Sequence, residues 1–403
     1  MTHYKAKLPN GLTILAEPVP TARSFAAGLF VRTGSRDEPS DVNGVSHFLE
    51  HMMFKGSQRL DAEAMNRIFD EMGAQYNAFT SQEMTAYYAA VLPEFAARTM
   101  EHLGELLRPA IRQEDFDTEK NVILEEIAMY EDEPGHRLYE KLMARHFGAH
   151  PLGMSILGPA DCIRALRREQ MADYFRQHYG PRNMVLAVTG QFDFDEVARL
   201  ADRYYGAWEP VGFERDYTSP APAGGREDLH DEKLNRCYVM GITSGPSAQD
   251  DDRFAARILA DILGDSENSR LYWSLVDPAI AEEADFSTYP HDRVGSFALS
   301  LVCDPERSDQ AMEIALAELA KVKHDLRDEE VARAKNKVAG SSVLHGESPQ
   351  ARMRAIGGSW VYNGEYRSLE DDLNALLAVT PDDLRRLLDR FTFEPMTVVT
   401  LGP

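Results

Sequence analysis

The sequence of 403 residues is poor in cysteine and in basic residues. Its three cysteines, Cys162, Cys237 and Cys303, are widely spaced and fit neither a disulfide framework nor a metal-ligand pattern. We therefore expect them to be small buried side chains in a reducing compartment. The 43 lysines and arginines against 66 acidic residues give a formal net charge of −23, which argues against binding to nucleic acid or to anionic lipid surfaces.

Long apolar runs and targeting segments are also missing from the sequence. No window approaches 18 uninterrupted apolar residues, and residues 1–11 lack the apolar core of a signal peptide. A glycine-rich phosphate-binding loop is not found either. We therefore expect a soluble, cytoplasmic protein without a membrane segment.

What the sequence does have is enough apolar residues, 43%, for large cores, and a length that predicts two domains. A stretch rich in proline, glycine and charge divides the chain near its middle. We predict an N-terminal domain over 1–210, a linker over 211–232 and a C-terminal domain over 233–403. Both halves begin with a strand that ends in a polar loop and is followed by a helix, which indicates a duplicated domain.

Apolar periodicity predicts strands interleaved with helices in both halves. Strands are predicted at 12–17, 25–35, 85–92, 184–190 and 237–247, and helices from about residue 44 and at 62–72, 95–107, 118–131, 161–179 and 254–263. Because 12–32 and 76–90 look like meanders, a purely parallel sheet fits less well. We predict an α+β fold with two homologous domains, each a mixed, largely antiparallel sheet covered by helices.

The residues that carry chemistry are concentrated in the segment His47-Phe-Leu-Glu50-His51. Two histidines four residues apart lie on one helix face, so both imidazoles can reach one tetrahedral metal ion such as zinc. Glu50 lies at the edge of that face, where a carboxylate can act as general base on a metal-bound water. Ser46 is either the N-terminal cap of this helix or a helical residue. The alternative interpretation is a helix with two incidental histidines.

A third ligand has to come from another part of the chain, and Glu126 is the strongest candidate. Val122, Ile123 and Tyr130 flank it at helical spacing, so its carboxylate is predicted to face apolar surroundings and to need a partner. Glu119 is seven residues earlier on the same face, placed to support a ligand from behind. Glu125 points about 100° away and is the weaker candidate. Without the histidines, the segment would be read as an ordinary acidic helix.

Together these segments resemble the pitrilysin/insulinase-type metallopeptidases with the inverted zinc motif His-x-x-Glu-His, and in particular the short branch that is similar to mitochondrial processing peptidase. The resemblance extends well beyond the five-residue motif. It covers 44–56, 73–87, 119–126, 150–158 and 183–190 of the first half, and the Gly-x-x-x-x-Ser-Arg-Leu signature at 264–271 of the second half.

The resemblance implies a zinc endopeptidase with one Zn²⁺ per chain, which hydrolyses short or unstructured peptides. Zinc would be held by His47, His51 and Glu126, while Glu50 would activate the water and return its proton to the leaving amine. Glu119 would support the site.

The resemblance also implies how substrate binds. Asn77, Ala78 and Phe79 would hold an extended peptide at the edge of the sheet, with main-chain hydrogen bonds supplying affinity. The alternative is an internal strand without an exposed edge.

At one place the second half departs from the family pattern. Active members commonly carry an Arg and a Tyr, seven residues apart, after the Ser-Arg-Leu signature, and these positions are Val276 and Glu283 here. The missing pair raises two alternatives: a weakly active or inactive structural subunit of a heterodimeric peptidase, and a scavenger that holds peptides without cutting them. Members of the family enclose substrate in a clamp of four related domains, so a chain with room for two is expected to form a homodimer, or a heterodimer with a related chain.

Overall fold

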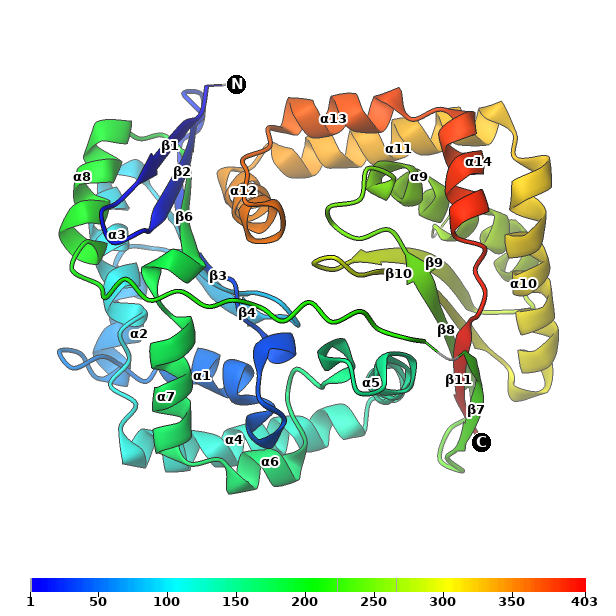
Figure 1. The fold of residues 1–403 in the computed structure, drawn as a ribbon, viewed down its shortest axis with the longest axis horizontal. Coiled ribbons are helices and arrows are strands. Elements are labelled where there is room, and N and C mark those ends of the chain that lie inside the picture. Colours follow the sequence, from blue (N-terminus) through cyan, green and yellow to red (C-terminus); the bar gives the residue numbers. More distant parts are fainter. Residues whose placement is uncertain (1, 223, 266) are drawn as a thin grey trace. The chain divides into compact units, whose positions relative to one another are not determined.

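Two β-sheets, one in each half of the sequence, organise the chain in the computed structural model, which describes residues 2–222, 224–265 and 267–403 (Figure 1). The chain divides into two compact units, each assembled from three segments. Unit 1 contains 1–129, 154–216 and 345–368, and unit 2 contains 130–153, 217–344 and 369–403. Both units therefore combine residues from the two halves of the sequence.

The sheet of unit 1 has the strand order β1-β2-β6-β3-β5-β4. Its strands are β1 (Tyr4–Lys7), β2 (Thr13–Pro18), β3 (Phe25–Val31), β4 (Gln75–Thr80), β5 (Thr85–Val91) and β6 (Met184–Gly190). All neighbouring pairs are antiparallel except β2 and β6, which run parallel. Every residue of β3 and β6 is buried, as expected for central strands with both faces covered.

The sheet of unit 2 repeats this arrangement in the order β7-β11-β8-β10-β9. Its strands are β7 (Gly225–His230), β8 (Cys237–Gly245), β9 (Glu283–Pro290), β10 (Gly295–Cys303) and β11 (Thr397–Gly402). The first pair, β7 and β11, is parallel and the others are antiparallel, which matches β2-β6-β3-β5-β4 strand for strand. The predicted α+β fold with two homologous domains and mixed sheets is confirmed.

Helices cover the faces of both sheets. Unit 1 contains α1 (Val45–Met53), α2 (Ala62–Glu71), α3 (Ala96–Leu106), most of α4 (Gln113–Glu131), α6 (Ala160–Ala165), α7 (Arg168–His178), α8 (Phe194–Tyr205) and α12 (Pro349–Asn363). Unit 2 contains α5 (Pro134–Phe147), α9 (Arg253–Gly264), α10 (Ser308–Asp325), most of α11 (Asp328–Gly346), α13 (Leu369–Ala378) and α14 (Pro381–Arg390). Among the described residues, no helix combines the length and apolarity that crossing a membrane requires.

Each half of the sequence lends one helix to the sheet of the other half. Helix α12 packs on β3 and β6 of unit 1, and α5 packs on β8 and β11 of unit 2. Gly357 allows the close approach of α12, because a Cβ atom there would lie 2.4 Å from the ring of Phe30. In the first turn of the helix, Arg352 donates two hydrogen bonds, of 3.0 and 2.7 Å, to the buried carboxylate of Glu17 on β2.

Because of this exchange, neither compact unit is a continuous stretch of sequence, whereas the predicted domains over 1–210 and 233–403 are continuous. The predicted linker, 211–232, is irregular over 211–222 but ends in β7, a full member of the second sheet. Nothing in the composition of 225–230 indicates this strand, because its residues alternate only weakly and are mostly exposed or half-buried. The strand forms because the edge of β11 offers it a parallel partner.

One predicted helix is wrong. The segment 161–179 forms two helices, α6 and α7, because Leu166 and Arg167 between them are extended. The Lys120 ammonium group donates to the carbonyls of Arg164 and Leu166, at 3.2 and 2.7 Å, and so satisfies the end of α6. The side chain of Gln170 accepts from the Arg167 amide and caps the start of α7.

Candidate metal centre

Helix α1 carries the two histidines and starts from an anchored N-terminus. Gly44 adopts a left-handed conformation, with φ of 95°, and a Cβ atom there would lie 2.4 Å from the Leu157 carbonyl oxygen. The buried carboxylate of Glu38 accepts hydrogen bonds of 2.7 Å from the amides of Gly44 and Ser46 and from the Asn43 side chain. Ser46 is therefore a helical residue, and the capping role belongs to Glu38, which the sequence did not indicate.

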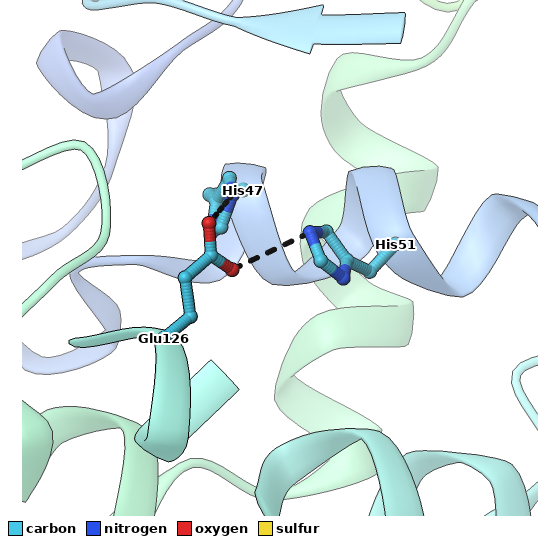
Figure 2. A group of neighbouring side chains, drawn as sticks. All are labelled: His47, His51 and Glu126. Atoms are coloured by element: carbon cyan, nitrogen blue, oxygen red, sulfur yellow. Dashed lines mark ion pairs between the residues drawn. The ribbon is translucent and has the colours of Figure 1, made fainter. Parts of the chain in front are cut away.

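The structure brings His47, His51 and Glu126 together in unit 1 (Figure 2). Nε2 of His47 lies 3.7 Å from Oε1 of Glu126, and Nε2 of His51 lies 3.6 Å from Oε2. The nearest ligand atoms of the three residues all lie within 4.8 Å of one another. Within the described part of the chain, this is the group of His, Cys, Asp and Glu side chains that could hold a metal ion.

The three side chains fit zinc. Bonds of about 2.0–2.2 Å in a tetrahedral site place neighbouring ligand atoms about 3.3 Å apart. The separations of 3.6 and 3.7 Å are close to that value, so small side-chain rotations would complete the geometry. Two imidazoles and one carboxylate also leave a fourth position for water, as catalytic zinc sites do.

Glu119 fixes the orientation of His51 from behind. Its Oε1 atom lies 2.9 Å from Nδ1 of His51, and its Oε2 atom lies 2.5 Å from Nζ of Lys55. A proton on Nδ1 satisfies the carboxylate and leaves the lone pair of Nε2 directed toward Glu126. Burial by itself would raise the pKa of Glu119, but the hydrogen bonds from His51 and Lys55 outweigh it and hold this pKa below its usual value.

Burial also sets the charge states of the ligands. Burial, assisted by the charge of His51, lowers the pKa of His47 to about 4, so this imidazole is neutral and ready to coordinate. Burial and the charge of Glu119 raise the pKa of Glu126, which His51 partly offsets. Burial lowers the pKa of His51, but the hydrogen bond to Glu119 and the charges of the neighbouring carboxylates outweigh burial, so the net effect is a raised pKa.

Glu50 lies beside the cluster and is held by a residue of the edge strand. The hydroxyl of Thr80 donates a 2.6 Å hydrogen bond to Oε2 of Glu50. Burial raises the pKa of Glu50, which the bond from Thr80 and the charge of His51 partly counteract. A half-buried carboxylate of raised pKa suits a group that must accept and then release a proton. Thr80 was not among the predicted site residues, although it directly follows the predicted substrate strand.

The predicted substrate strand is β4, at the edge of its sheet. Strand β4 pairs with β5 on one side and is the last strand in the order, so the alternative of an internal strand is excluded. Ala78 is buried, Phe79 is half-buried and Asn77 is exposed. The Asn77 side chain accepts a 2.9 Å hydrogen bond from the Ala78 amide. The roles of these three residues in binding stay predictions.

The surroundings predicted for Glu126 are partly wrong. Val122 is 42% exposed, so the surroundings of Glu126 are less apolar than its helical neighbours predicted. The carboxylate is directed toward the two histidines instead. Glu125, the weaker candidate, is exposed and is not part of the cluster.

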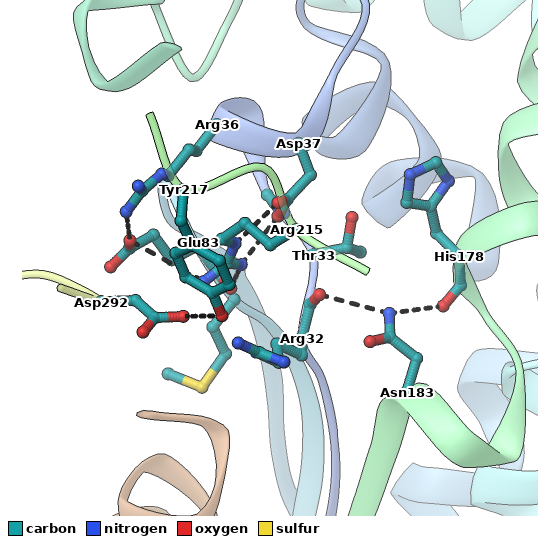
Figure 3. A network of polar contacts seen from close by, with 12 residues as sticks. Arg32, Thr33, Arg36, Asp37, Glu83, His178, Asn183, Arg215, Tyr217 and Asp292 are labelled. Carbon is teal, nitrogen blue, oxygen red and sulfur yellow. Dashed lines mark hydrogen bonds and ion pairs between the residues drawn. The ribbon is translucent and has the colours of Figure 1, made fainter. Parts of the chain in front are cut away.

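A buried ion-pair network lies at the turn that follows Thr80 (Figure 3). Arg215 donates to both carboxylate oxygens of Asp37, at 2.7 and 2.8 Å, and to the Glu83 carbonyl at 2.8 Å. Arg36 pairs with the Glu83 carboxylate at 2.5 Å. These contacts fix the β4–β5 turn to the start of the segment that was predicted to be a plain linker.

The signature of the second half has a structural role. Arg270 pairs with Glu330 at 2.8 Å and with Asp325 at 2.5 Å, and Leu271 is completely buried. Val276 packs against the apolar core of unit 2, and Glu283 is an exposed first residue of β9. Neither can replace a substrate-binding Arg or Tyr.

Comparison with known proteins agrees with this geometry. Residues 13–160 match the family model "Insulinase (Peptidase family M16)", and residues 165–338 match "Peptidase M16 inactive domain". An uncharacterized zinc protease of Streptomyces coelicolor is 33% identical, over 100% of this chain and 90% of its own length.

Solved structures share the whole fold. A protease from Helicobacter pylori superimposes with a TM-score of 0.92 at 21% identity, covering 100% of this chain and 99% of the other. A chain of complex III2 from Candida albicans gives a TM-score of 0.87 at 18% identity, with coverage of 99% and 95%.

Proposed function

The chain belongs to the insulinase family of peptidases, family M16, and from this we propose that it is a zinc-dependent endopeptidase that hydrolyses short or unstructured peptides. The observation that carries the proposal is the convergence of His47, His51 and Glu126 beside Glu50. This set supplies metal ligands and a general base from two helices of one compact unit. The curated relatives are named zinc proteases, which agrees with it.

The proposed chemistry divides between the metal and Glu50. Zinc held by the three ligands would polarise the peptide carbonyl and lower the pKa of a bound water. Glu50 accepts the proton of the attacking water and delivers it to the amide nitrogen of the leaving group. Thr80 donates to Oε2 and so leaves Oε1 as the less engaged oxygen, which we expect to carry the proton. Glu119 keeps the proton of His51 on Nδ1, away from the metal.

Substrate would bind as an extra strand on β4. The Ala78 amide faces away from β5, since it is bonded to the Asn77 side chain rather than to the sheet. An incoming peptide carbonyl would displace Asn77 from this amide, which frees the Asn77 side chain to contact the peptide. Selection by backbone hydrogen bonds favours extended, unstructured peptides over folded proteins.

We propose that the active form is a dimer, either of two copies of this chain or of this chain with a related one. The support is the resemblance to peptidases that enclose substrate in four related domains, of which this chain supplies two. Val276 and Glu283 add a second reason, because a partner would have to supply the carbonyl-binding side chains that these two positions lack.

A fluorogenic peptide assay tests the function. The purified protein should cleave a quenched unstructured peptide, lose this activity in a chelator and regain it with Zn²⁺. The Glu50→Gln variant should bind zinc normally but lose at least 100-fold in kcat, an order-of-magnitude figure for a general base. Full activity in this variant would contradict the mechanism.

A matched pair of substitutions on α4 tests the ligand assignment. Glu126→Gln should lower the zinc content, whereas Glu125→Gln, one position earlier on the exposed face, should leave it unchanged. Equal zinc contents in the two variants would contradict Glu126 as a ligand.

A structural subunit is the second candidate function, favoured by Val276 and Glu283. It predicts folded protein without peptidase activity even at full zinc loading. If activity then appears on mixing with a related chain that carries the Arg and the Tyr, this chain is one half of a heterodimeric peptidase. Absence of activity in both experiments would leave the structural role.

A further inference from the structure

The structure brings together two cysteines that are 66 positions apart in the sequence. Cys237 is the first residue of β8 and Cys303 is the last residue of β10, and the antiparallel register pairs them directly. Both are buried, at 7% and 0% exposure, and each thiol lies close enough to shift the pKa of the other. Unit 2 contains both of them, together with all their contacts described below.

The pairing is compatible with a disulfide. Directly opposed residues of antiparallel strands have Cα atoms about 4.5–5.5 Å apart, within the range of about 4.4–6.8 Å that disulfides span. Their Cβ atoms lie about 4.5–5.5 Å apart in such pairs and need to approach to about 3.5–4.5 Å. The required movement is small, and both residues are at strand ends, where the sheet is least constrained.

The surroundings make the two thiols chemically unequal. The neighbouring Cys303 thiol has the largest effect on Cys237 and lowers its pKa, and Ser308 at the first turn of α10 and the charge of Arg226 act in the same direction. Burial and Asp228 act against them. The Cys237 thiol, burial and the charges of Asp304 and Glu282 raise the pKa of Cys303. Cys237 is therefore the more readily ionised sulfur.

Access also favours Cys237. It directly follows the half-buried Arg236 at the start of its strand and is 7% exposed, whereas Cys303 is completely buried. We therefore expect a small oxidant to reach the Cys237 thiol before the Cys303 thiol. The remaining cysteine, Cys162, is half-buried in unit 1, and its sulfur contacts the Ser40 carbonyl at 3.8 Å.

We propose that Cys237 and Cys303 form a dithiol that a hydroperoxide oxidises reversibly to a disulfide between β8 and β10. The Cys237 thiolate attacks one peroxide oxygen, the O–O bond breaks, and the sulfur becomes a sulfenic acid as hydroxide leaves and takes up a proton. The Cys303 sulfur then attacks the Cys237 sulfur and passes its proton to the departing hydroxyl group, which leaves as water. Two thiols lose two electrons in total, and hydrogen peroxide becomes two molecules of water.

Thiol counting and peptide mapping test this proposal on the whole chain. Reduced protein should show three thiols when titrated under denaturing conditions, and protein treated with hydrogen peroxide should show one, with three restored by dithiothreitol. Mass spectrometry of the oxidised protein should find one cross-linked peptide that contains Cys237 and Cys303. Three remaining thiols, or a loss of thiols without this cross-link, would overturn the proposal.

Single substitutions test the order of events and control for Cys162. Cys303→Ser should trap a sulfenic acid on Cys237 that a dimedone probe labels, whereas Cys237→Ser should give no such label on Cys303. Cys162→Ser should form the same cross-link as the unaltered chain. Labelling of Cys303 in place of Cys237, or a disulfide that requires Cys162 and links two chains, would refute the assignment. The peptide map of the unaltered chain decides the question even if a variant does not fold.

Discussion

Replacing Glu119 by glutamine tests how the protein fixes the tautomer of a metal ligand. The Glu119 carboxylate accepts from His51 Nδ1 at 2.9 Å and from Lys55 Nζ at 2.5 Å, using one oxygen for each. A glutamine amide has one oxygen and one NH₂ group, so it cannot accept from both donors. If its oxygen faces His51, the NH₂ group meets the Lys55 ammonium. If its oxygen faces Lys55, the NH₂ group requires an unprotonated Nδ1, which moves the proton of His51 to Nε2 and blocks coordination.

The expected loss follows from this conflict. Removing a carboxylate that orients a metal-bound histidine typically weakens metal affinity by about 10–100-fold, which corresponds to about 1.4–2.7 kcal/mol. Lys55→Met should restore part of the affinity in the Glu119→Gln background, because the amide oxygen can then accept from His51 without competition. In the unaltered background, the same Lys55→Met substitution should weaken zinc binding slightly, since it leaves the buried Glu119 with one partner fewer.

Competition with a chromophoric chelator measures these zinc affinities without any substrate. The four proteins form a double-mutant cycle, in which the two substitutions are expected to be non-additive. Wild-type zinc affinity in Glu119→Gln, or no recovery in the double variant, would refute the role assigned to Glu119.

Four further predictions concern the base, the acid stability, the packing and the metal. Thr80→Val should lower kcat by about tenfold without changing zinc affinity, because a bond to a charged group is lost, while Thr80→Ser should stay active. Burial raises the pKa of Glu330, but hydrogen bonds and charge from Arg327 and Arg270 lower it more, to about 2. The ionised carboxylate therefore stabilises the fold by about 3 kcal/mol above pH 4.5, and this stabilisation is lost as the pH falls toward 2. Urea unfolding midpoints measured across this pH range should show the loss. Gly357→Ala should lower the free energy of unfolding by about 1–3 kcal/mol, whereas Gly358→Ala, with open space around its Cβ, should not. A chelator should abolish peptidase activity but leave the circular dichroism spectrum and a cooperative unfolding transition in place.

Each of these predictions has a contrary result. A lower zinc affinity in Thr80→Val would make Thr80 a structural support of the metal site. Unchanged acid sensitivity in Glu330→Gln would show that other carboxylates dominate at low pH. Equal effects of the two glycine substitutions would show that the close approach of α12 to Phe30 does not cause the destabilisation. Unfolding in the presence of a chelator would show that the metal has a structural role.

Much of the fold could be predicted because it depends on local patterns. The strand β6 was predicted at its observed bounds, and α2 and α3 within one residue at each end, since each has an apolar stripe and clear turn residues. The exchange of α5 and α12 between the units could not be predicted, because an apolar helix face does not say which sheet it will cover. The same limitation hid β7, which forms only beside β11.

The candidate site was predictable where its residues are close in sequence. His47, Glu50 and His51 are placed by helical spacing alone, and Glu119 and Glu126 by the seven-residue interval on α4. Thr80, Glu38 and Arg215 could not be found in this way, because their roles rest on hydrogen bonds between different elements, which no periodicity in the sequence indicates. The juxtaposition of Cys237 and Cys303 is a further example, since only the register of β8 and β10 brings them together.

The duplication separates the requirements of folding from those of catalysis. Both units reach the same strand order, and the long helices α4 and α11 have the same length of 19 residues. Counted from the helix starts, the positions of Glu119 and Glu126 correspond to Ala334 and Ser341, which cannot support or bind a metal in the same way. Because unit 2 forms its sheet and core without these carboxylates, the fold itself does not depend on metal ligands. The carboxylates and imidazoles of the unit 1 cluster are therefore not needed to reach this strand order, and their cost in desolvation points to a role other than folding.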